Sequence, residues 1–350
     1  MRFTPVLANS GIRCYYTNAR LFLMEGRVIH MAKIIVTFGV PSDGFRALRG
    51  HELHIPPAGE SYPRKKLLAL LADADAVLAC NAFDRELIEA GRKLKLIVCY
   101  GAGYDNIDVQ AATEQGVPVA NTPDSVTFST AELAIALMLA LGRRIAELNS
   151  RMHAANPQGL FVMGTHMGCS LEGSTLGIVG MGRIGGRVAD IARSMGMRVL
   201  YTAHAPKPAR ESLGDQYVSL ERLMAESDFV SLHCPHTAQT HNLLTREKLA
   251  HMKPTAYLIN TARGAIVDEQ ALIDALQNRR IAGAALDVFP EEPNINPALL
   301  QLKNVILTPH IGSNTLYTRN RMAEAASERI LEALAGRRPQ NVINPQVYAG

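Results

Sequence analysis

The sequence predicts an α/β protein of two domains, each built around a parallel, doubly wound sheet. Short apolar runs alternate with helix-like stretches from residue 33 to 120, and a second alternating series runs from 175 to 307. Such alternation is typical of parallel strands joined by crossover helices. A chain of 350 residues also favours two hydrophobic cores over one.

The first series predicts a small open α/β domain. Ser61 and Pro63, followed by the apolar stretch Leu67 to Leu71, predict a capped helix between two of its strands. We expect the strands at residues 34–38, 76–80, 96–99 and 117–120.

A glycine-rich loop, Gly101, Ala102 and Gly103, follows the third of these strands. Loops of this kind at a strand's carboxyl end expose backbone N–H groups that can hold an anion. A tight turn capped by Asp105 or Asp108 explains the same residues equally well.

The domain boundaries follow from a long apolar helix expected over residues 129–152, where the chain crosses to the second domain. A final helix over 315–335 comes after the last strand of that domain, so we expect it to return to the first. The first domain then comprises residues 32–128 and 313–350, and the second residues 129–312. Residues 1–31 have no clear amphipathic period, and we interpret them as an extension that reflects a mis-set start or an organelle leader.

The sheet of the second domain begins beyond a connector at residues 156–170. Its elements alternate in the order expected of a doubly wound sheet. We expect strands at 176–179, 229–234, 257–260, 284–288 and 305–307, and helices over 220–225, 245–252 and 269–277.

A glycine turn joins the first strand of the second domain to a helix. Gly180, Gly182 and Gly185 form the pattern GxGxxG, in which the glycines allow a tight turn, close approach of a pyrophosphate and close helix packing. The amides of Arg183 and Ile184 would open the helix toward phosphate. The pattern therefore favours a dinucleotide site over a purely structural turn.

Composition excludes several classes of function. Of the formal net charge of +4, +3 lies in residues 1–30, and no basic stripe is interleaved with aromatic residues, so we expect no nucleic-acid partner. The longest apolar stretch, Leu133 to Leu141, is too short to span a membrane, so we expect no membrane partner. Five scattered cysteines form no disulfide pattern and favour the cytoplasm.

Histidines cluster around the end of the strand expected at 229–234, at His233, His236 and His241, with Cys234 and Pro235 among them. A zinc site would need a fourth ligand that nothing in the sequence identifies. We therefore expect no metal, and interpret this segment as the end of a strand that lines the cofactor.

Three polar residues follow later strands: Arg263, Glu292 and His310. Ligands bind at the carboxyl ends of strands in open α/β sheets. Taken singly, the arginine could be a surface ion pair, the glutamate a loop charge and the histidine a cap.

Taken together, the motifs GxGxxG, NTARG, DVFxxEP and TPH occur in an order that resembles the D-2-hydroxyacid dehydrogenase family over about residues 32–345. The segment from His310 to Asn320 is similar to the glyoxylate and hydroxypyruvate reductase branch. The resemblance implies two Rossmann-like or flavodoxin-like domains with an interdomain cleft, and a homodimer. It also implies that a nicotinamide cofactor reduces a small 2-keto acid to the D-2-hydroxy acid.

The resemblance also implies residue roles. His310 would donate the proton, Glu292 would favour its protonated form, and Arg263 would hold the substrate's carboxylate and carbonyl. Gly101, Ala102, Gly103, Arg263 and His310 would bind the substrate. Further cofactor contacts would be Cys234, Pro235, Thr240, Thr261, Ala262, Arg263 and Asp287.

Cofactor choice depends on the end of the second strand of the βαβ unit. NAD-specific members carry an acid there, whereas this chain has Ala203 followed by His204, Lys207 and Arg210. Because no acid repels a 2′-phosphate and cations could bind it, NADP(H) is favoured, and NAD(H) stays possible.

Two alternatives stay open. The chain could act on a different substrate, such as D-lactate or 3-phosphoglycerate. It could also be a non-enzymatic, NAD(H)-sensing protein of the corepressor type, which the same family includes.

Overall fold

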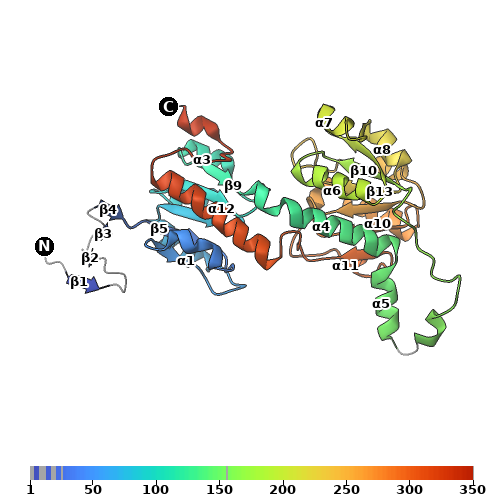
Figure 1. The fold of residues 1–350 in the computed structure, drawn as a ribbon, viewed down its shortest axis with the longest axis horizontal. Helices are drawn as coiled ribbons and strands as arrows, with labels where there is room; N and C mark the ends of the chain where they lie inside the picture. Colours follow the sequence, from blue (N-terminus) through green and yellow to red (C-terminus); the bar gives the residue numbers. More distant parts are fainter. Residues whose placement is uncertain (1–3, 8–12, 17–20, 25–26, 155–156, 350) are drawn as a thin grey trace. The chain divides into compact units, whose positions relative to one another are not determined.

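The computed structural model describes residues 4–7, 13–16, 21–24, 27–154 and 157–349 (Figure 1). The chain divides into two compact units. The first comprises Met1–Val126 and Thr315–Gly350, and the second comprises Thr127–Asn314. Both contain a parallel sheet covered by helices, so the α/β fold class is confirmed.

The first unit contains a five-stranded parallel sheet with the order β6-β5-β7-β8-β9. Because β5 pairs with β6 on one side and β7 on the other, the strand order reverses at β5. The bounds are β5 Lys33–Val36, β6 Glu52–His54, β7 Ala76–Ala79, β8 Leu96–Cys99 and β9 Val119–Asn121.

Each face of this sheet buries its own set of apolar side chains. One face packs on α1 (Arg64–Leu71), α2 (Arg85–Ala90) and α3 (Val109–Glu114). The other packs on the 3-10 helix η1 (Asp43–Leu48) and on α12 (Leu316–Leu334), which crosses the sheet in Figure 1. Strand residues alternate between the faces, as successive side chains of a strand must.

The second unit contains a seven-stranded parallel sheet with the order β12-β11-β10-β13-β14-β15-β16. The order reverses between β10 and β13, which makes the carboxyl ends of these two strands the place where a ligand is expected. The bounds are β10 Thr175–Val179, β11 Arg198–Thr202, β12 Gln216–Tyr217, β13 Phe229–Leu232, β14 Tyr257–Asn260, β15 Gly283–Leu286 and β16 Val305–Leu307.

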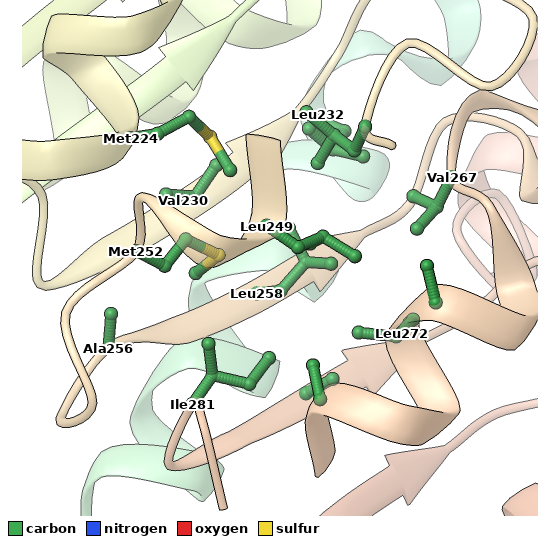
Figure 2. Packing of buried hydrophobic residues seen from close by; sticks show 14 of the residues in the cluster. Met224, Val230, Leu232, Leu249, Met252, Ala256, Leu258, Val267, Leu272 and Ile281 are labelled. Carbon is green, nitrogen blue, oxygen red and sulfur yellow. The ribbon is translucent and has the colours of Figure 1, made fainter. Parts of the chain in front are cut away.

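Helices cover both faces of the second sheet. On one face, α8 (Leu220–Glu226), α9 (Arg246–Ala250) and α10 (Glu269–Gln277) enclose the apolar cluster that Figure 2 shows, which includes Leu249 and Leu258. On the other face lie α4 (Pro123–Gly142) and α6 (Arg183–Ser194). Short elements complete the unit: α7 Pro208–Glu211, α11 Pro297–Leu300, η2 Pro157–Leu160 and η3 Gly264–Ile266.

The single helix expected over residues 129–152 is wrong, because the chain forms two helices there. α4 ends at Gly142, whose carbonyl oxygen accepts a hydrogen bond from the Cys169 amide at 2.8 Å. Arg144 then adopts the left-handed conformation (φ 55°), and α5 begins at Ile145 and ends at His153. The return of the chain at Cys169 therefore occupies the end of α4 and turns the chain away.

The apolar composition of α4 has a structural cause. Among the described residues, α4 is a helix of 20 residues that contains an 18-residue window with a mean hydropathy of 1.6, enough by length and composition to cross a membrane. Of that window, 56% is buried inside the protein, and Ala134, Met138 and Leu141 belong to the core beneath the helix.

Two further expectations need correction. Ser61 does not cap α1, because it forms an isolated antiparallel bridge with Phe38, and Pro63 is the N-cap residue. The strands expected at 229–234 and 284–288 end earlier, at Leu232 and Leu286, where the chain turns to form the ligand edge.

The expected extension, residues 1–31, lies partly outside the described residues. Its described parts form a four-stranded antiparallel sheet, β1-β2-β3-β4. The bounds are β1 Thr4–Leu7, β2 Arg13–Tyr16, β3 Leu21–Met24 and β4 Arg27–His30. At the other end of the chain, the 3-10 helix η4 spans Pro345–Tyr348.

Candidate functional site

The glycine turn after β10 has a separate constraint at each of its three glycines. Gly180 has φ +98°, and a Cβ there would lie 2.5 Å from the Cys234 amide nitrogen. A Cβ on Gly185 would lie 2.2 Å from the Gly180 carbonyl oxygen. At Gly182 a Cβ would meet nothing within 4 Å. The first and third glycines are thus required by packing, and the second leaves open space at the start of a helix.

That helix, α6, is suited to holding a phosphate. Gly182 is its N-cap residue, and no side chain caps the helix. Arg183 and Ile184 are the first two helical residues, and no acid lies in the first turn. Backbone N–H groups at a helix start attract anions, so this turn can hold a pyrophosphate at the point where the strand order reverses.

Ala203, His204 and Lys207 lie just beyond the end of β11. The His204 and Lys207 side chains are exposed, and the Lys207 amide donates a hydrogen bond to the Tyr201 hydroxyl at 2.6 Å. The Tyr217 hydroxyl donates to the Ala203 carbonyl at 3.2 Å. Two cationic or ionisable side chains are therefore available beside the strand end, with no acid at position 203.

Arg210 has a different role from the phosphate contact that the sequence suggested. Its guanidinium binds Asp215 at 2.7 Å and Asp190 at 2.8 Å, and Arg193 binds the same two carboxylates. Asp215 is 2% exposed. Arg210 therefore neutralises a buried acid within the domain.

The segment from His233 to His241, which follows β13, lies where the strand order of the sheet reverses. The Thr240 hydroxyl donates to the Pro235 carbonyl at 2.6 Å, which ties the segment into a compact loop. Burial raises the pKa of the Cys234 thiol to about 11 and lowers the pKa of His233 to about 4. Cys234 is thus a neutral thiol, and the His233 imidazole, 2.8 Å from the Ser231 hydroxyl, is neutral at working pH.

The remaining histidines of this segment contact each other. His236 Nε2 lies 3.2 Å from His241 Nδ1. Across the described part of the chain, no three His, Cys, Asp or Glu side chains gather as metal ligands.

The end of β14 shapes the backbone around Arg263. The Asn260 side chain, 1% exposed, donates to the Arg263 carbonyl at 2.8 Å and accepts from the Ala262 amide at 3.0 Å. Thr261 Oγ1 is buried and has no hydrogen-bond partner among the residues that the structure describes. The turn thereby presents Thr261, Ala262 and Arg263 in sequence at the ligand edge.

Glu292 and His310 form the pair that the sequence predicted. Glu292 Oε2 lies 2.7 Å from His310 Nδ1, and Oε1 accepts from the Phe289 amide at 2.9 Å. Burial acts to raise the pKa of Glu292, but the hydrogen bonds from His310 and Phe289 and the charge of Arg263 outweigh it and lower the pKa. Glu292 is thus an ionised anchor for one nitrogen of a half-exposed imidazole, and its second nitrogen stays available.

The turn that carries His310 depends on Asp287, a contribution that the sequence did not reveal. One oxygen of Asp287 accepts from the Thr308 hydroxyl (2.6 Å) and the Ile311 amide (2.8 Å), and the other accepts from the Gly312 amide (2.9 Å). His310 has φ +52°, which is uncommon outside glycine. These bonds place Asp287 in support of the turn, and its expected contact with the cofactor stays a prediction.

In the first unit, the carbonyls of the three loop residues after β8, Gly101 to Gly103, all accept hydrogen bonds from other protein groups. The Gly101 carbonyl accepts from the Thr122 amide (2.9 Å), the Ala102 carbonyl from the Asn121 side chain (2.7 Å), and the Gly103 carbonyl from the Cys99 thiol (3.0 Å). In a trans peptide the next N–H points opposite to the carbonyl. The amides of Ala102 and Gly103 therefore point away from these partners, as an anion site requires.

Several of these supporting residues carry little sequence signal. Asn121 and Asn260 end the buried strands β9 and β14, and Thr122 follows β9, at positions where polar residues are also common as plain turn formers. The partners of Asn121 and Thr122 lie on the backbone of the loop after β8, so the sequence offered no pattern that would pair them. Asn260 instead binds the backbone of the turn that follows it.

Comparison with known proteins gives consistent results. Residues 135–312 match the family model described as D-isomer specific 2-hydroxyacid dehydrogenase, NAD binding domain. A protein named glyoxylate reductase from Thermococcus litoralis is 43% identical over 323 residues, which is 90% of this chain and 97% of that protein. A glyoxylate reductase from Pyrococcus furiosus is 40% identical over 328 residues, with 90% and 96% covered.

Solved structures show the same similarity. A Thermus thermophilus protein has a TM-score of 0.81 and 41% identity, covering 89% of this chain and 99% of its own. An NADPH-dependent glyoxylate/hydroxypyruvate reductase from Sinorhizobium meliloti, solved with NADP and malonate, has a TM-score of 0.78 and 30% identity, covering 89% and 96%.

Proposed function

Because the chain belongs to the D-isomer specific 2-hydroxyacid dehydrogenase family, we propose that it reduces glyoxylate or hydroxypyruvate to the 2-hydroxy acid, with D configuration where the product is chiral. The Glu292–His310 pair carries the proposal, because it sets a proton donor at the ligand edge of a dinucleotide-binding sheet. The relatives named glyoxylate reductase and the neighbour named glyoxylate/hydroxypyruvate reductase support this choice of substrate.

The residues divide the reaction among them. A dinucleotide whose pyrophosphate is held at the glycine turn would supply the hydride to the carbonyl carbon. His310 donates the proton from Nε2 to the carbonyl oxygen while Glu292 holds Nδ1 and stabilises the protonated ring. Arg263 binds the substrate's carboxylate and polarises the carbonyl through its planar guanidinium. The outward amides of Ala102 and Gly103 bind the carboxylate.

A proton-donor variant tests this assignment. His310→Asn should lower kcat for glyoxylate and hydroxypyruvate by about 10²- to 10⁴-fold, the usual contribution of general acid catalysis. Cofactor binding, followed by NADPH fluorescence, should not change. Full activity of the variant would remove His310 from the proton-donor role, and a wild-type protein that reduced neither acid would overturn the proposed function.

We propose NADP(H) as the preferred cofactor, with NAD(H) also accepted. Lys207 and His204 are exposed just beyond the end of β11, where cations could bind a 2′-phosphate, and position 203 carries no acid to repel it. Lys207→Ala should lower the ratio of kcat/KM for NADPH over NADH by about 10-fold, as expected for one lost charge-assisted contact. Lys303→Ala, which removes an exposed lysine outside this segment, is the control. An unchanged ratio in Lys207→Ala would refute the preference.

We also propose a homodimer formed through the segment from Ile145 to Met167, the arm that follows α4. Phe161 and Met163 are 78% and 100% exposed, and further apolar side chains share the arm. Exposed apolar side chains that gather in one segment are typical of interaction surfaces, and α5 extends away from the sheet of its unit in Figure 1. The exposed set is Ile145, Met152, Phe161, Val162, Met163 and Met167.

Light scattering after size exclusion tests the dimer. The wild type should have twice the 38.0 kDa mass of one chain. The double variant Phe161→Asp with Met163→Asp should have the mass of one chain. A monomeric wild type would refute the proposal.

We propose that the enzyme works in the cytoplasm. Cys80, Cys99, Cys169 and Cys234 are free thiols, and two of them, Cys99 and Cys234, lie at the proposed ligand edges. Fractionation of the source cells with an activity assay would check this location.

A further inference from the structure

Arg319 lies at the ligand edge of the first unit and has no role in the reaction as described. It belongs to the first turns of α12, and its guanidinium carbon lies 5.6 Å from the centre of the Tyr100 ring. Its backbone carbonyl accepts the Tyr100 hydroxyl at 2.8 Å. Its charge also acts to lower the pKa of the Cys80 thiol, although burial raises that pKa to about 12 overall.

The positions of Cys80 and Tyr100 show where the Arg319 guanidinium lies on the sheet. Cys80 follows β7 and Tyr100 follows β8, so Arg319 lies over the carboxyl ends of two adjacent strands. The Cys80 amide donates to the Thr37 hydroxyl at 2.9 Å, and Thr37 follows β5. The strand order reverses at β5, which makes this edge the switch point of the sheet, where open α/β sheets bind ligands.

The charge of Arg319 is not balanced by a carboxylate. Within the described part of the chain no Asp or Glu pairs with it, whereas Arg321 and Arg329 on the same helix contact Glu324 and Glu328. The first turn of α12 contains no acid. A partly buried cation near a helix start is unfavourable unless something negative or electron-rich accompanies it. The Tyr100 ring face supplies part of that stabilisation.

The anion-binding loop begins at the residue after Tyr100. The loop amides and the Arg319 guanidinium therefore lie on one strand end, in one unit. A keto acid held at its carboxylate by the loop would have its C3 substituent as the group left to recognise. A guanidinium is a strong donor to an oxygen acceptor there.

We propose that Arg319 is a specificity-determining residue that binds an oxygen on C3 of the substrate, so that the enzyme selects 2-keto acids with a C3 oxygen, such as hydroxypyruvate. The proposal rests on the proposed function, since it assumes that the carboxylate is held at the Gly101 to Gly103 loop. It narrows the substrate class beyond what the Glu292–His310 pair requires.

Hydroxypyruvate and pyruvate test this, because they differ only in the C3 hydroxyl. The wild type should favour hydroxypyruvate over pyruvate in kcat/KM by about 10- to 100-fold, the effect of a hydrogen bond to a charged group. Arg319→Met, which keeps the aliphatic packing, should reduce that preference to less than about 3-fold while changing kcat/KM for pyruvate and glyoxylate by less than about 3-fold. Arg319→Lys should restore part of the preference.

Arg321→Met is the matched control, since Arg321 lies on the same helix and its side chain is 60% exposed. It should leave all three substrates unchanged. A uniform loss for all three substrates in Arg319→Met would show a role in holding Tyr100 and would overturn the proposal. Equal wild-type activity on hydroxypyruvate and pyruvate would also overturn it while leaving the proposed function intact. A wild type that reduces no keto acid would overturn both.

Discussion

Gly180 and Gly182 stand two residues apart, yet different constraints act on them. Gly180→Ala places a Cβ at positive φ and 2.5 Å from the Cys234 amide nitrogen, so the turn must distort. Gly182→Ala places a Cβ in open space at an ordinary φ of −82°. We therefore expect Gly180→Ala to destabilise the fold by about 1–3 kcal/mol, and Gly182→Ala to weaken NADPH binding with little change in stability.

Urea unfolding and NADPH titration on both variants separate the two effects. Gly214→Ala is a useful third variant, because Gly214 has φ +92° with open space around it and lies outside the turn. It should cost stability through strain alone. Tight NADPH binding by Gly182→Ala would mean that no phosphate approaches this glycine.

His233 makes stability depend on pH. Its folded pKa of about 4 lies below the ordinary value of 6.5 because burial disfavours the charged ring. The unfolded chain therefore takes up the proton first, and the contribution is full above pH 6.5 and is lost as pH falls from 6.5 to 4. The loss amounts to about 3 kcal/mol. The free energy of unfolding, measured with urea from pH 7.5 to 4.5, should fall less steeply in His233→Gln than in the wild type. Equal slopes would contradict the neutral, buried state of this ring.

The family resemblance implied that Glu292 and His310 are partners, and the 2.7 Å contact between Glu292 Oε2 and His310 Nδ1 agrees with this. The sequence could not assign Asp287 or Arg210, since a carboxylate or guanidinium near a site can act on a ligand or on the chain itself. Three bonds to the turn around His310 show that Asp287 supports the chain, while its expected contact with the cofactor stays a prediction. Arg210 pairs with Asp190 and with buried Asp215. The contacts of Asp287 and the contact of Arg210 with Asp190 join segments that only folding brings together.

The turn between β16 and α12 depends on the Asp287 side chain, which accepts three hydrogen bonds from it. Asp287→Asn replaces one accepting oxygen by an NH₂ group, which is a donor. This donor would face either the Gly312 amide or the two donors on the other oxygen, which are the Thr308 hydroxyl and the Ile311 amide. Because Asp287 is 1% exposed, we expect a loss of about 2–4 kcal/mol in the free energy of unfolding. We also expect kcat to fall more than cofactor affinity, since His310 loses its backbone support.

Asp274→Asn supplies the comparison for Asp287→Asn. Asp274 pairs with Arg246 at the surface, and its side chain is 30% exposed, so the change should cost less than about 1 kcal/mol. Urea unfolding and steady-state kinetics on both variants give the measurement. Similar, small losses in the two would show that the turn does not need the Asp287 carboxylate.

Helix and strand bounds were predicted correctly from the sequence where local residues determine them, and wrongly where a distant contact does. The helix at 269–277 and the strands at 257–260 and 305–307 have the expected bounds, because periodicity and local caps determine them. The strand β6 was missed, since Glu52 to His54 is short and partly exposed at a sheet edge. The break between α4 and α5 was missed because the contact of Gly142 with Cys169 spans 27 residues.

Over the whole chain, each unit has hydrophobic clusters of its own, on both faces of its sheet. The glycine turn lies in the second unit only. A ligand that binds the folded state stabilises it by about 2.7 kcal/mol at 100 times its Kd, and local opening is suppressed where the ligand binds. NADPH alone should therefore slow hydrogen exchange in peptides from β10, α6 and β13 more than in peptides from β5, β7 and β8.

Mass spectrometry of deuterium uptake with and without NADPH measures this difference, and Gly182→Ala, exposed to the same NADPH concentration, should lose most of the protection. Adding a keto acid with NADP⁺ should extend protection to the loop at Gly101 to Gly103, because the substrate's carboxylate is held there. If NADPH alone slowed hydrogen exchange equally in both units, the two units would instead undergo local unfolding as one cooperative unit. The reaction would then depend on the cofactor to order the substrate loop as well as to supply the hydride.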